Sequence, residues 1–176
     1  MILHICGNLC AGKTTAAEHV QSILGWPVVP VGRLRNVVRN EHRLWADVVP
    51  RLWRAWDQVG APSGIWLSTG FNHHEVMALE RYTPQALRRV WLTAPPTLLH
   101  RRLADRLASP TYAAPRGYWP YIEDSEMLID ELANYDRRIR PLPWPVDRII
   151  NTAETSISDM VVQIVAVARE GLFPRD

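Results

Sequence analysis

The most constraining feature of this sequence is a glycine-rich stretch near its start, residues 5–20, ICGNLCAGKTTAAEHV. Within it, Gly7, Gly12, Lys13 and Thr14 fit the pattern G-x-x-x-x-G-K-[ST]. The pattern follows an apolar run typical of a buried strand and precedes a segment typical of a helix. This order predicts a phosphate-binding P-loop at the end of the first strand of an α/β protein.

The chemistry of such a loop explains why Lys13 is the only lysine among 20 Lys and Arg residues. Glycines let the backbone turn, so that N–H groups and the start of the helix point at phosphate oxygens. The compact ammonium of Lys13 suits the β and γ phosphates, and the Thr14 hydroxyl suits Mg²⁺. We therefore expect ATP and Mg²⁺ as cofactors, with the nucleotide bound by Gly7, Asn8, Gly12, Lys13, Thr14 and Thr15.

Length and composition predict one globular domain, residues 1–176, with 47% hydrophobic and 22% charged residues. A net charge of +2 is too small to indicate a polyanionic partner by itself. No apolar run approaches the roughly 20 residues that span a bilayer, and the N-terminus predicts a strand instead of a leader. We expect a cytoplasmic protein (host cytoplasm if phage-encoded), without a membrane partner, as a monomer or homodimer. Cys6 and Cys10 indicate neither a disulfide framework nor a metal site.

Hydrophobic periodicity predicts alternating strands and helices along the chain. We expect strands at 2–6, 28–31, 65–68, 89–93 and 148–150. We expect helices at 14–24, 33–43, 44–59 with an interruption near Pro50, 74–81, 97–107, 123–138 and 158–170. This order predicts a three-layer α/β/α fold with a five-stranded, mostly parallel sheet. Residues 33–60 would form a helical acceptor region, and the Ser-, Pro- and Gly-containing stretch at about 109–121 would form a lid.

Three further stretches resemble the adenylate kinase and nucleoside monophosphate kinase group of P-loop kinases. VWLTAPPTLLHRRLADR (90–106) is similar to the strand and helix that end in R-x-x-x-R, here Arg102 and Arg106. GIWLSTGFNHHEVMALE (64–80) resembles G-x-x-L-D-G-F-P-R, and ELANYDRRIRPL (131–142) resembles R-L-x-x-Y followed by P-L. The resemblance spans most of the chain. It implies an ATP-dependent kinase in which the last arginine, Arg106, opens the lid and contacts ATP. We also expect Arg102 to bind the nucleotide, and both arginines to meet the charge on the transferring phosphate.

The sequence departs from this group on the acceptor side. The group's Mg²⁺-associated Asp falls on Ser68 or Thr69, and the following phosphate-binding Arg falls on His73. The Arg that precedes Leu after the lid falls on Glu131. An acceptor phosphate would lose two arginine clamps, so these departures favour a hydroxyl acceptor over a phosphate.

A hydroxyl acceptor benefits from a general base. Similar kinases of alcohols carry an Asp soon after the second strand, but VPVGRLRN (29–36) contains no carboxylate. We favour His73 as a catalytic residue and His74 as an acceptor contact, because both follow the third strand at the edge where α/β folds bind ligands. Both also fit a surface or helix-capping role. The full set of candidate bases is Glu41, Asp47, Asp57, His73, His74 and Glu75.

The stretch RLRNVVRNEHRLWADVVPRLWRAW (33–56) mixes arginines with tryptophans, a combination that favours nucleotides or nucleic acids. It predicts acceptor contacts by Arg33, Arg35 and Trp53. The tryptophans also fall at helical spacing, so they equally fit a helix core, with the arginines on a solvated face. The sequence leaves both interpretations open.

These features together lead to one hypothesis and two alternatives. The hypothesis is transfer of the γ-phosphate of Mg-ATP to a hydroxyl on a nucleotide or nucleic acid, as in the phage-type kinases of 5-hydroxymethyluracil in DNA. The first alternative is a (deoxy)nucleoside monophosphate kinase in which Arg33, Arg35 or Arg39 replaces the missing clamps. The second is a regulatory nucleotide-binding NTPase. A guanine-reading N-K-x-D motif is absent, because Lys13 is the only lysine.

Overall fold

The computed structural model describes residues 1–34, 42–58, 60, 63–70, 75–77, 79, 87–109, 129–131, 133–134, 137, 142 and 144–172. Its strands are β1 (Ile2–Gly7), β2 (Val28–Val29), β3 (Gly64–Leu67), β4 (Leu87–Thr93) and β5 (Arg148–Asn151). Its helices are α1 (Lys13–Leu24), α2 (Val31–Leu34), α3 (His42–Gln58), α5 (Pro96–Ala108) and α7 (Ile157–Leu172). Residues 75–77 and 79 are also helical, as are 129–131, 133–134 and 137.

The five strands form one parallel sheet in the order β2-β3-β1-β4-β5. The central strand β1 pairs with β3 on one side and β4 on the other, with Ile5 opposite both Leu67 and Val90. All carboxyl ends therefore lie at one edge of the sheet. At that edge the chain leaves β1 between its neighbours β3 and β4, where the strand order reverses direction. Ligands of α/β folds bind at such a point.

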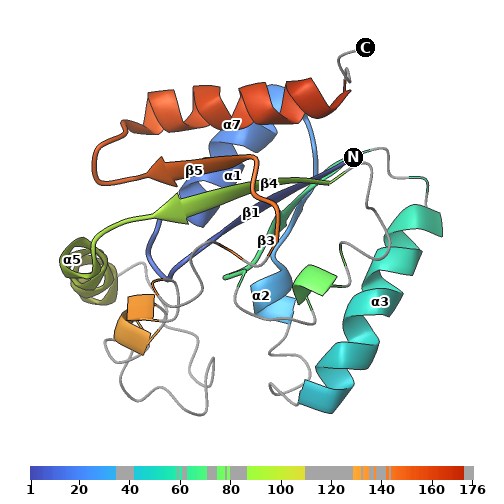
Figure 1. Ribbon diagram of the computed structural model, residues 1–176, viewed down its shortest axis with the longest axis horizontal. Helices are drawn as coiled ribbons and strands as arrows, with labels where there is room; N and C mark the ends of the chain where they lie inside the picture. Colours follow the sequence, from blue (N-terminus) through green and yellow to red (C-terminus); the bar gives the residue numbers. More distant parts are fainter. Residues whose placement is uncertain are drawn as a thin grey trace.

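Helices cover both faces of this sheet, as Figure 1 shows: α1 and α7 lie on one face, and α2 and α3 lie on the other. The side chains of β1 alternate between the two faces. Leu3 and Ile5 belong to the larger core cluster with residues of α1 and α7. Ile2 packs with Trp45 and Trp53 of α3 on the opposite face. The predicted three-layer α/β/α fold with a five-stranded parallel sheet is therefore confirmed.

Helix α3 corrects one expectation, because it runs unbroken from His42 to Gln58 through Pro50. Proline removes one backbone hydrogen bond, but Trp45, Val49 and Trp53 recur at intervals of four and are all buried on the same face. Packing of this face, rather than helix propensity, stabilises the helix across the proline. The predicted strand at 28–31 is also shorter, since Val31 already begins α2.

Helix α7 closes the fold with an amphipathic pattern, burying Met160, Val161 and Ile164 while Val162 lies in solvent. The same residues pack with Ala16 and Val20 of α1 in the core. Among the helices that the structure describes, none combines the length and the apolar character needed to cross a membrane.

Candidate active site

The glycine-rich loop leaves β1 through a position that has no room for a side chain. A Cβ atom on Gly7 would lie 2.0 Å from the carbonyl oxygen of Leu92, and Gly7 has φ 139°, which L-residues rarely adopt. The Gly7 amide donates a hydrogen bond to the Thr69 carbonyl, 3.1 Å away. The loop is therefore wedged between β4 and the chain that leaves β3.

Two more residues of the loop adopt left-handed backbone conformations, Cys10 with φ 56° and Gly12 with φ 91°. These turns bring the chain directly into α1, whose N-cap is Gly12 and whose first turn contains no acidic residue. No side chain caps this helix end. The first N–H groups of α1 and the positive end of its dipole therefore suit a bound anion.

Lys13 folds back across the loop and donates hydrogen bonds from Nζ to the carbonyl oxygens of Gly7, at 2.9 Å, and Asn8, at 2.7 Å. The pKa of Lys13 is lowered to about 8, mainly by burial and to a smaller extent by the positive charge of Arg106, while the Cys6 and Cys10 thiols oppose this shift. The ammonium is thus placed at the Gly7 end of the loop and titrates near pH 8. This position suits contact with phosphate oxygens.

Asn8 is buried and fastens the loop to the rest of the molecule. Its Oδ1 accepts the Leu9 amide, and its Nδ2 donates to the Ile129 carbonyl, 3.1 Å away. Asn8 therefore ties the loop to the helical residues that begin at Ile129. The predicted nucleotide contact by its side chain remains a prediction.

Thr14 and Thr15 lie in the first turn of α1, where Thr14 is exposed and Thr15 is half-buried. Within the described ranges, no group of three His, Cys, Asp or Glu residues could hold a metal ion. This arrangement fits Mg²⁺, which often takes most of its ligands from phosphates and water and needs only one or two protein oxygens. The predicted contact between the Thr14 hydroxyl and Mg²⁺ remains a prediction.

Arg102 joins the loop to the turn that follows β5. One guanidinium nitrogen donates to the Cys10 carbonyl, 3.3 Å away, and to the Thr152 hydroxyl, 2.9 Å away; the other donates to the Thr152 carbonyl at 2.8 Å. The described contacts of Arg102 are to the protein, and its predicted contact with ATP remains a prediction. Arg106, one turn later on α5, is exposed and close enough to Lys13 to influence its pKa.

Sequence reasoning missed Thr152, because its role depends on a turn that lies beside the loop only in the folded chain. Near this edge, a cavity of about 340 Å³ is lined by Asn8, Trp91, Thr93, Asn151 and Arg137 among others. Its size falls in the range of small-ligand sites. It lies beside the loop at the carboxyl ends of β4 and β5.

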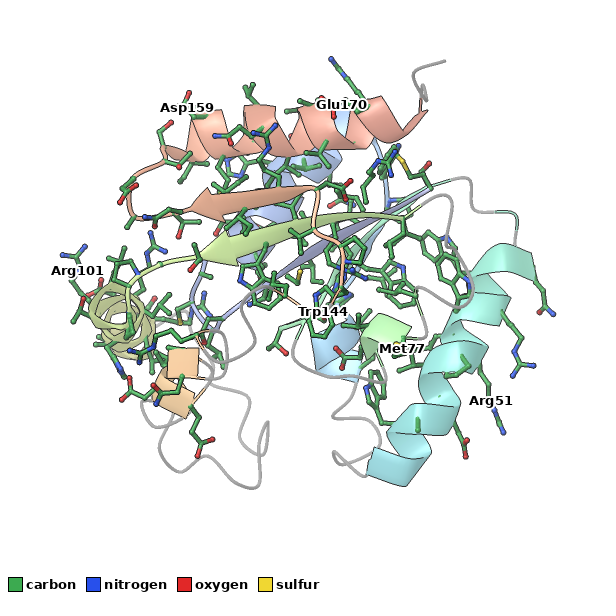
Figure 2. The ribbon with its side chains drawn as sticks, viewed as in Figure 1. Arg51, Met77, Arg101, Trp144, Asp159 and Glu170 are labelled. Carbon is green, nitrogen blue, oxygen red and sulfur yellow. The ribbon has the colours of Figure 1, made fainter. Side chains whose placement is uncertain are left out.

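The predicted acceptor region differs from expectation in its tryptophans and arginines. Trp53 is only 6% exposed, and its ring meets Trp66 edge-on at 5.4 Å between centroids. Trp53 is therefore a core residue instead of an acceptor contact. Arg51 and Arg54 are exposed, and Figure 2 shows Arg51 pointing away from the sheet on the outer side of α3. For the described side chains of this segment, the structure supports packed tryptophans, with Arg51 and Arg54 solvated.

Several other predicted residues lie outside the described part of the chain. This applies to Arg35, His73 and His74, to the 109–121 lid after Ser109, and to the side chain of Arg33. Glu75 is described: it is 1% exposed, and its Oε1 accepts a hydrogen bond from Trp45 Nε1 at 3.0 Å. This bond ties α3 to the segment after β3. The identity of the general base remains a prediction.

Comparisons with known proteins find solved structures that share this fold. No protein-family model matches the chain, and no curated protein matches it. A sugar kinase from Janibacter superposes with a TM-score of 0.67 at 12% identity, covering 96% of this chain and 94% of the other. A shikimate kinase from Bacteroides thetaiotaomicron gives 0.64 at 14% identity, covering 96% and 98%. The YorR protein from Bacillus subtilis, in complex with phosphorylated GDP, gives 0.67 at 13% identity, covering 100% of each chain. At these identities the likeness shows the fold.

Proposed function

We propose that this protein is a single-domain, ATP-dependent phosphotransferase. The observation that carries the proposal is the phosphate loop: Lys13 lies across it, and the uncapped N-terminus of α1 opens beside it. The fold supports the same class, because the sugar kinase and the shikimate kinase share it across nearly their whole length.

In this mechanism, the chain's own groups bind and orient the terminal phosphates. The Lys13 ammonium exchanges its bonds to the Gly7 and Asn8 carbonyls for phosphate oxygens. The first N–H groups of α1 stabilise the negative charge without moving, since the loop already holds them in place. Arg106 adds positive charge from α5, close to Lys13. Mg²⁺, held by the Thr14 hydroxyl, would neutralise charge on the transferring group.

As the acceptor we propose a hydroxyl group on a nucleotide or nucleic acid, with 5-hydroxymethyluracil in DNA as one example. A hydroxyl acceptor is supported by the kinases of sugar and shikimate, which are alcohols, among the matching folds. A nucleotide acceptor is supported by the YorR complex. The outward direction of Arg51 favours a free nucleotide or a single base in a pocket over an extended strand lying on α3.

The test is transfer of radiolabelled γ-phosphate from ATP to a panel of acceptors, with Lys13→Ala as the blank. The panel contains nucleosides, nucleoside monophosphates, DNA ends and DNA with hydroxymethylated bases. Label on a hydroxyl of a nucleoside or of DNA supports the proposal. Label only on monophosphates, as nucleoside diphosphate products, would replace it with the monophosphate kinase alternative. Binding and hydrolysis of Mg-ATP without transfer to any acceptor would favour the regulatory NTPase alternative, and no binding of Mg-ATP would overturn the proposed function.

A further inference from the structure

A line of hydrogen bonds crosses the face of the sheet opposite α1 and α7 and ends at the exit of β3. His4 of β1 is fully buried beside its β4 neighbour Arg89. Arg89 Nε donates to His4 Nδ1 at 3.2 Å. His4 Nε2 lies 2.7 Å from Oγ of Ser68, the residue after β3. Three strands thus contribute one residue each to a buried polar line.

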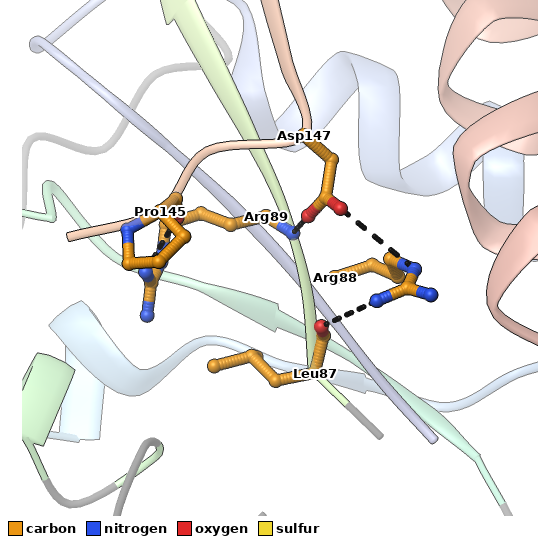
Figure 3. A network of polar contacts seen from close by, with 5 residues as sticks. All are labelled: Leu87, Arg88, Arg89, Pro145 and Asp147. Atoms are coloured by element: carbon orange, nitrogen blue, oxygen red, sulfur yellow. Dashed lines mark hydrogen bonds and ion pairs between the residues drawn. The ribbon is translucent and has the colours of Figure 1, made fainter. Parts of the chain in front are cut away.

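The backbone and side chain of Arg89 are both fixed by the segment before β5. The Arg89 amide donates to Asp147 Oδ2 at 2.7 Å, and one guanidinium nitrogen donates to the Pro145 carbonyl at 2.8 Å. Figure 3 shows these bonds, with Arg88 pairing to the other oxygen of Asp147 at 3.8 Å. The direction in which Arg89 donates to His4 is therefore set by the fold.

This arrangement determines the tautomer of His4. A guanidinium N–H can only donate, so His4 Nδ1 must be the acceptor and carry no proton. Burial, and secondarily the Arg89 charge, lower the pKa of His4 to about 3, so the ring is neutral at pH 7. A neutral imidazole with a bare Nδ1 carries its proton on Nε2. His4 therefore donates to Ser68 Oγ.

Ser68 Oγ also accepts the Gly70 amide at 3.0 Å, so both of its lone pairs are used. Its hydroxyl hydrogen has no acceptor in the described part of the chain, although the side chain is only 3% exposed. A buried polar hydrogen without an acceptor is costly to maintain. Ser68 can only donate, and among the described residues no oxygen accepts from it.

The position of Ser68 indicates which oxygen it could meet. The carbonyl of its neighbour Thr69 accepts the Gly7 amide, while the carbonyl of Gly7 accepts Lys13 Nζ. Ser68 therefore lies near Gly7, at the end of the loop where the Lys13 ammonium is bound. Arg102 contacts a different part of the loop, at Cys10. Gly70 keeps the turn tight, since a Cβ there would lie 2.7 Å from the Trp91 ring.

We propose that Ser68 is a substrate-binding residue whose hydroxyl donates a hydrogen bond to an oxygen of the terminal phosphoryl group, and that His4 and Arg89 are positioning residues for it. The proposal rests on the proposed binding of Mg-ATP. A metal-bound water would itself need to donate, and Ser68 Oγ has no lone pair left to accept it. A phosphoryl oxygen only accepts hydrogen bonds, so it could accept the Ser68 hydroxyl hydrogen and end the series of hydrogen bonds from Arg89 through His4 to Ser68.

The experiment compares calorimetric affinities for Mg-AMPPNP and Mg-ADP in the wild type, Ser68→Ala and Ser63→Ala. Ser63 is a buried serine at the opposite end of β3 and is the matched control. Losing a hydrogen bond to a charged group should weaken Mg-AMPPNP binding by roughly 10- to 100-fold in Ser68→Ala. Mg-ADP binding should stay within about twofold, as should both affinities in Ser63→Ala.

Two further measurements keep the test valid if Ser68→Ala folds poorly. His4→Gln retains a donor for Ser68 and an acceptor for Arg89, so it should preserve the ratio of Mg-AMPPNP affinity to Mg-ADP affinity. His4→Leu retains neither and should reduce this ratio. Nitrogen NMR of His4 at pH 7 should show a protonated Nε2 and a bare Nδ1.

Different failures have different meanings. Equal loss of both ligands in Ser68→Ala, or no loss, would overturn this inference alone, and so would the opposite His4 tautomer. A wild-type protein that binds neither ligand would overturn the proposed function as well.

Discussion

The two sides of the phosphate loop are built by different means. On the side that we propose binds the nucleotide, the nucleotide side, the Arg102 cation holds the Cys10 and Thr152 carbonyls and the Thr152 hydroxyl in place. On the side that we propose faces the acceptor, formed by the β3 exit at Ser68–Gly70 and by α3, the described contacts run through buried side chains. A backbone site can be recognised from a short motif, whereas a site built from side chains depends on residues far apart in the chain.

The largest expected effect tests whether the loop depends on backbone geometry. Gly7→Ala would press a methyl group against the Leu92 carbonyl and force a residue with a Cβ to φ 139°. We expect a loss of about 3 kcal/mol or more in unfolding free energy, measured by urea denaturation. The control Gly25→Ala, at φ 68° with nothing within 4 Å, should cost about 1 kcal/mol. Similar losses in both variants would contradict the wedged position of Gly7.

The next effect concerns the pH dependence of ATP binding. Phosphate needs the Lys13 ammonium, and the pKa of Lys13 in the free protein is lowered to about 8. Above that pH, binding must take up a proton, so the Kd for Mg-ATP should rise up to about tenfold per pH unit. Calorimetry from pH 7 to 9.5 measures it. The slope should vanish in Lys13→Met, and a wild-type Kd that is flat across this range would exclude Lys13 as the titrating contact.

The same shift has a consequence for the unliganded protein. The unfolded chain keeps Lys13 protonated up to the ordinary lysine pKa of 10.5, whereas in the folded chain the pKa is about 8. Between these values the unfolded state binds more protons, so the contribution of Lys13 to folding stability rises with pH.

A smaller effect separates two neighbouring arginines on α5. Arg102→Ala removes the bonds to Cys10 and Thr152 and should weaken Mg-ATP binding about tenfold while lowering stability by about 1–3 kcal/mol. Arg101→Ala is the control, because Arg101 is exposed and points away from the loop in Figure 2. Affinity and thermal unfolding are measured together. If Arg101→Ala lowers the Mg-ATP affinity and the stability as much as Arg102→Ala does, the positive charge of α5 as a whole, and not the described contacts of Arg102, stabilises the nucleotide side.

The smallest expected effect tests the outer face of α3. Arg51→Ala and Arg54→Ala should change phosphate transfer by less than about twofold, since both side chains are exposed. The measurement is the KM for the best acceptor of the transfer panel. A tenfold increase would show that this face contacts the acceptor and would revive the interpretation of residues 33–56 as a nucleotide- or nucleic-acid-binding segment.

The contrast between a site built from backbone and a site built from distant side chains also explains how much of the structure could be predicted from the sequence. The sheet, the loop and α1 follow from local patterns, the period of apolar residues and the spacing of Gly7, Gly12 and Lys13. The break expected at Pro50 was wrong, because packing of Trp45 and Trp53 outweighs the local cost of proline.

The polar line to Ser68 could not be predicted from local patterns. His4, Ser68 and Arg89 are adjacent only because the register of β1 against β3 and β4 brings them together. The one available signal was a charged residue, Arg89, inside an apolar strand. Trp53 failed as a predicted contact for a related reason, since the sequence does not show which side of α3 meets the sheet.

The central place of β1 also affects the order of events during synthesis. This strand is made first, but its partners are Gly64–Leu67 and Leu87–Thr93, which the ribosome supplies much later. Such distant pairing is entropically costly and slows folding. Until β4 has emerged, the nascent chain carries β1 without its β4 partner, together with the loop that depends on this pairing. Acquisition of nucleotide binding should therefore wait for the arrival of β4, about halfway along these 176 residues, and not follow completion of the motif itself.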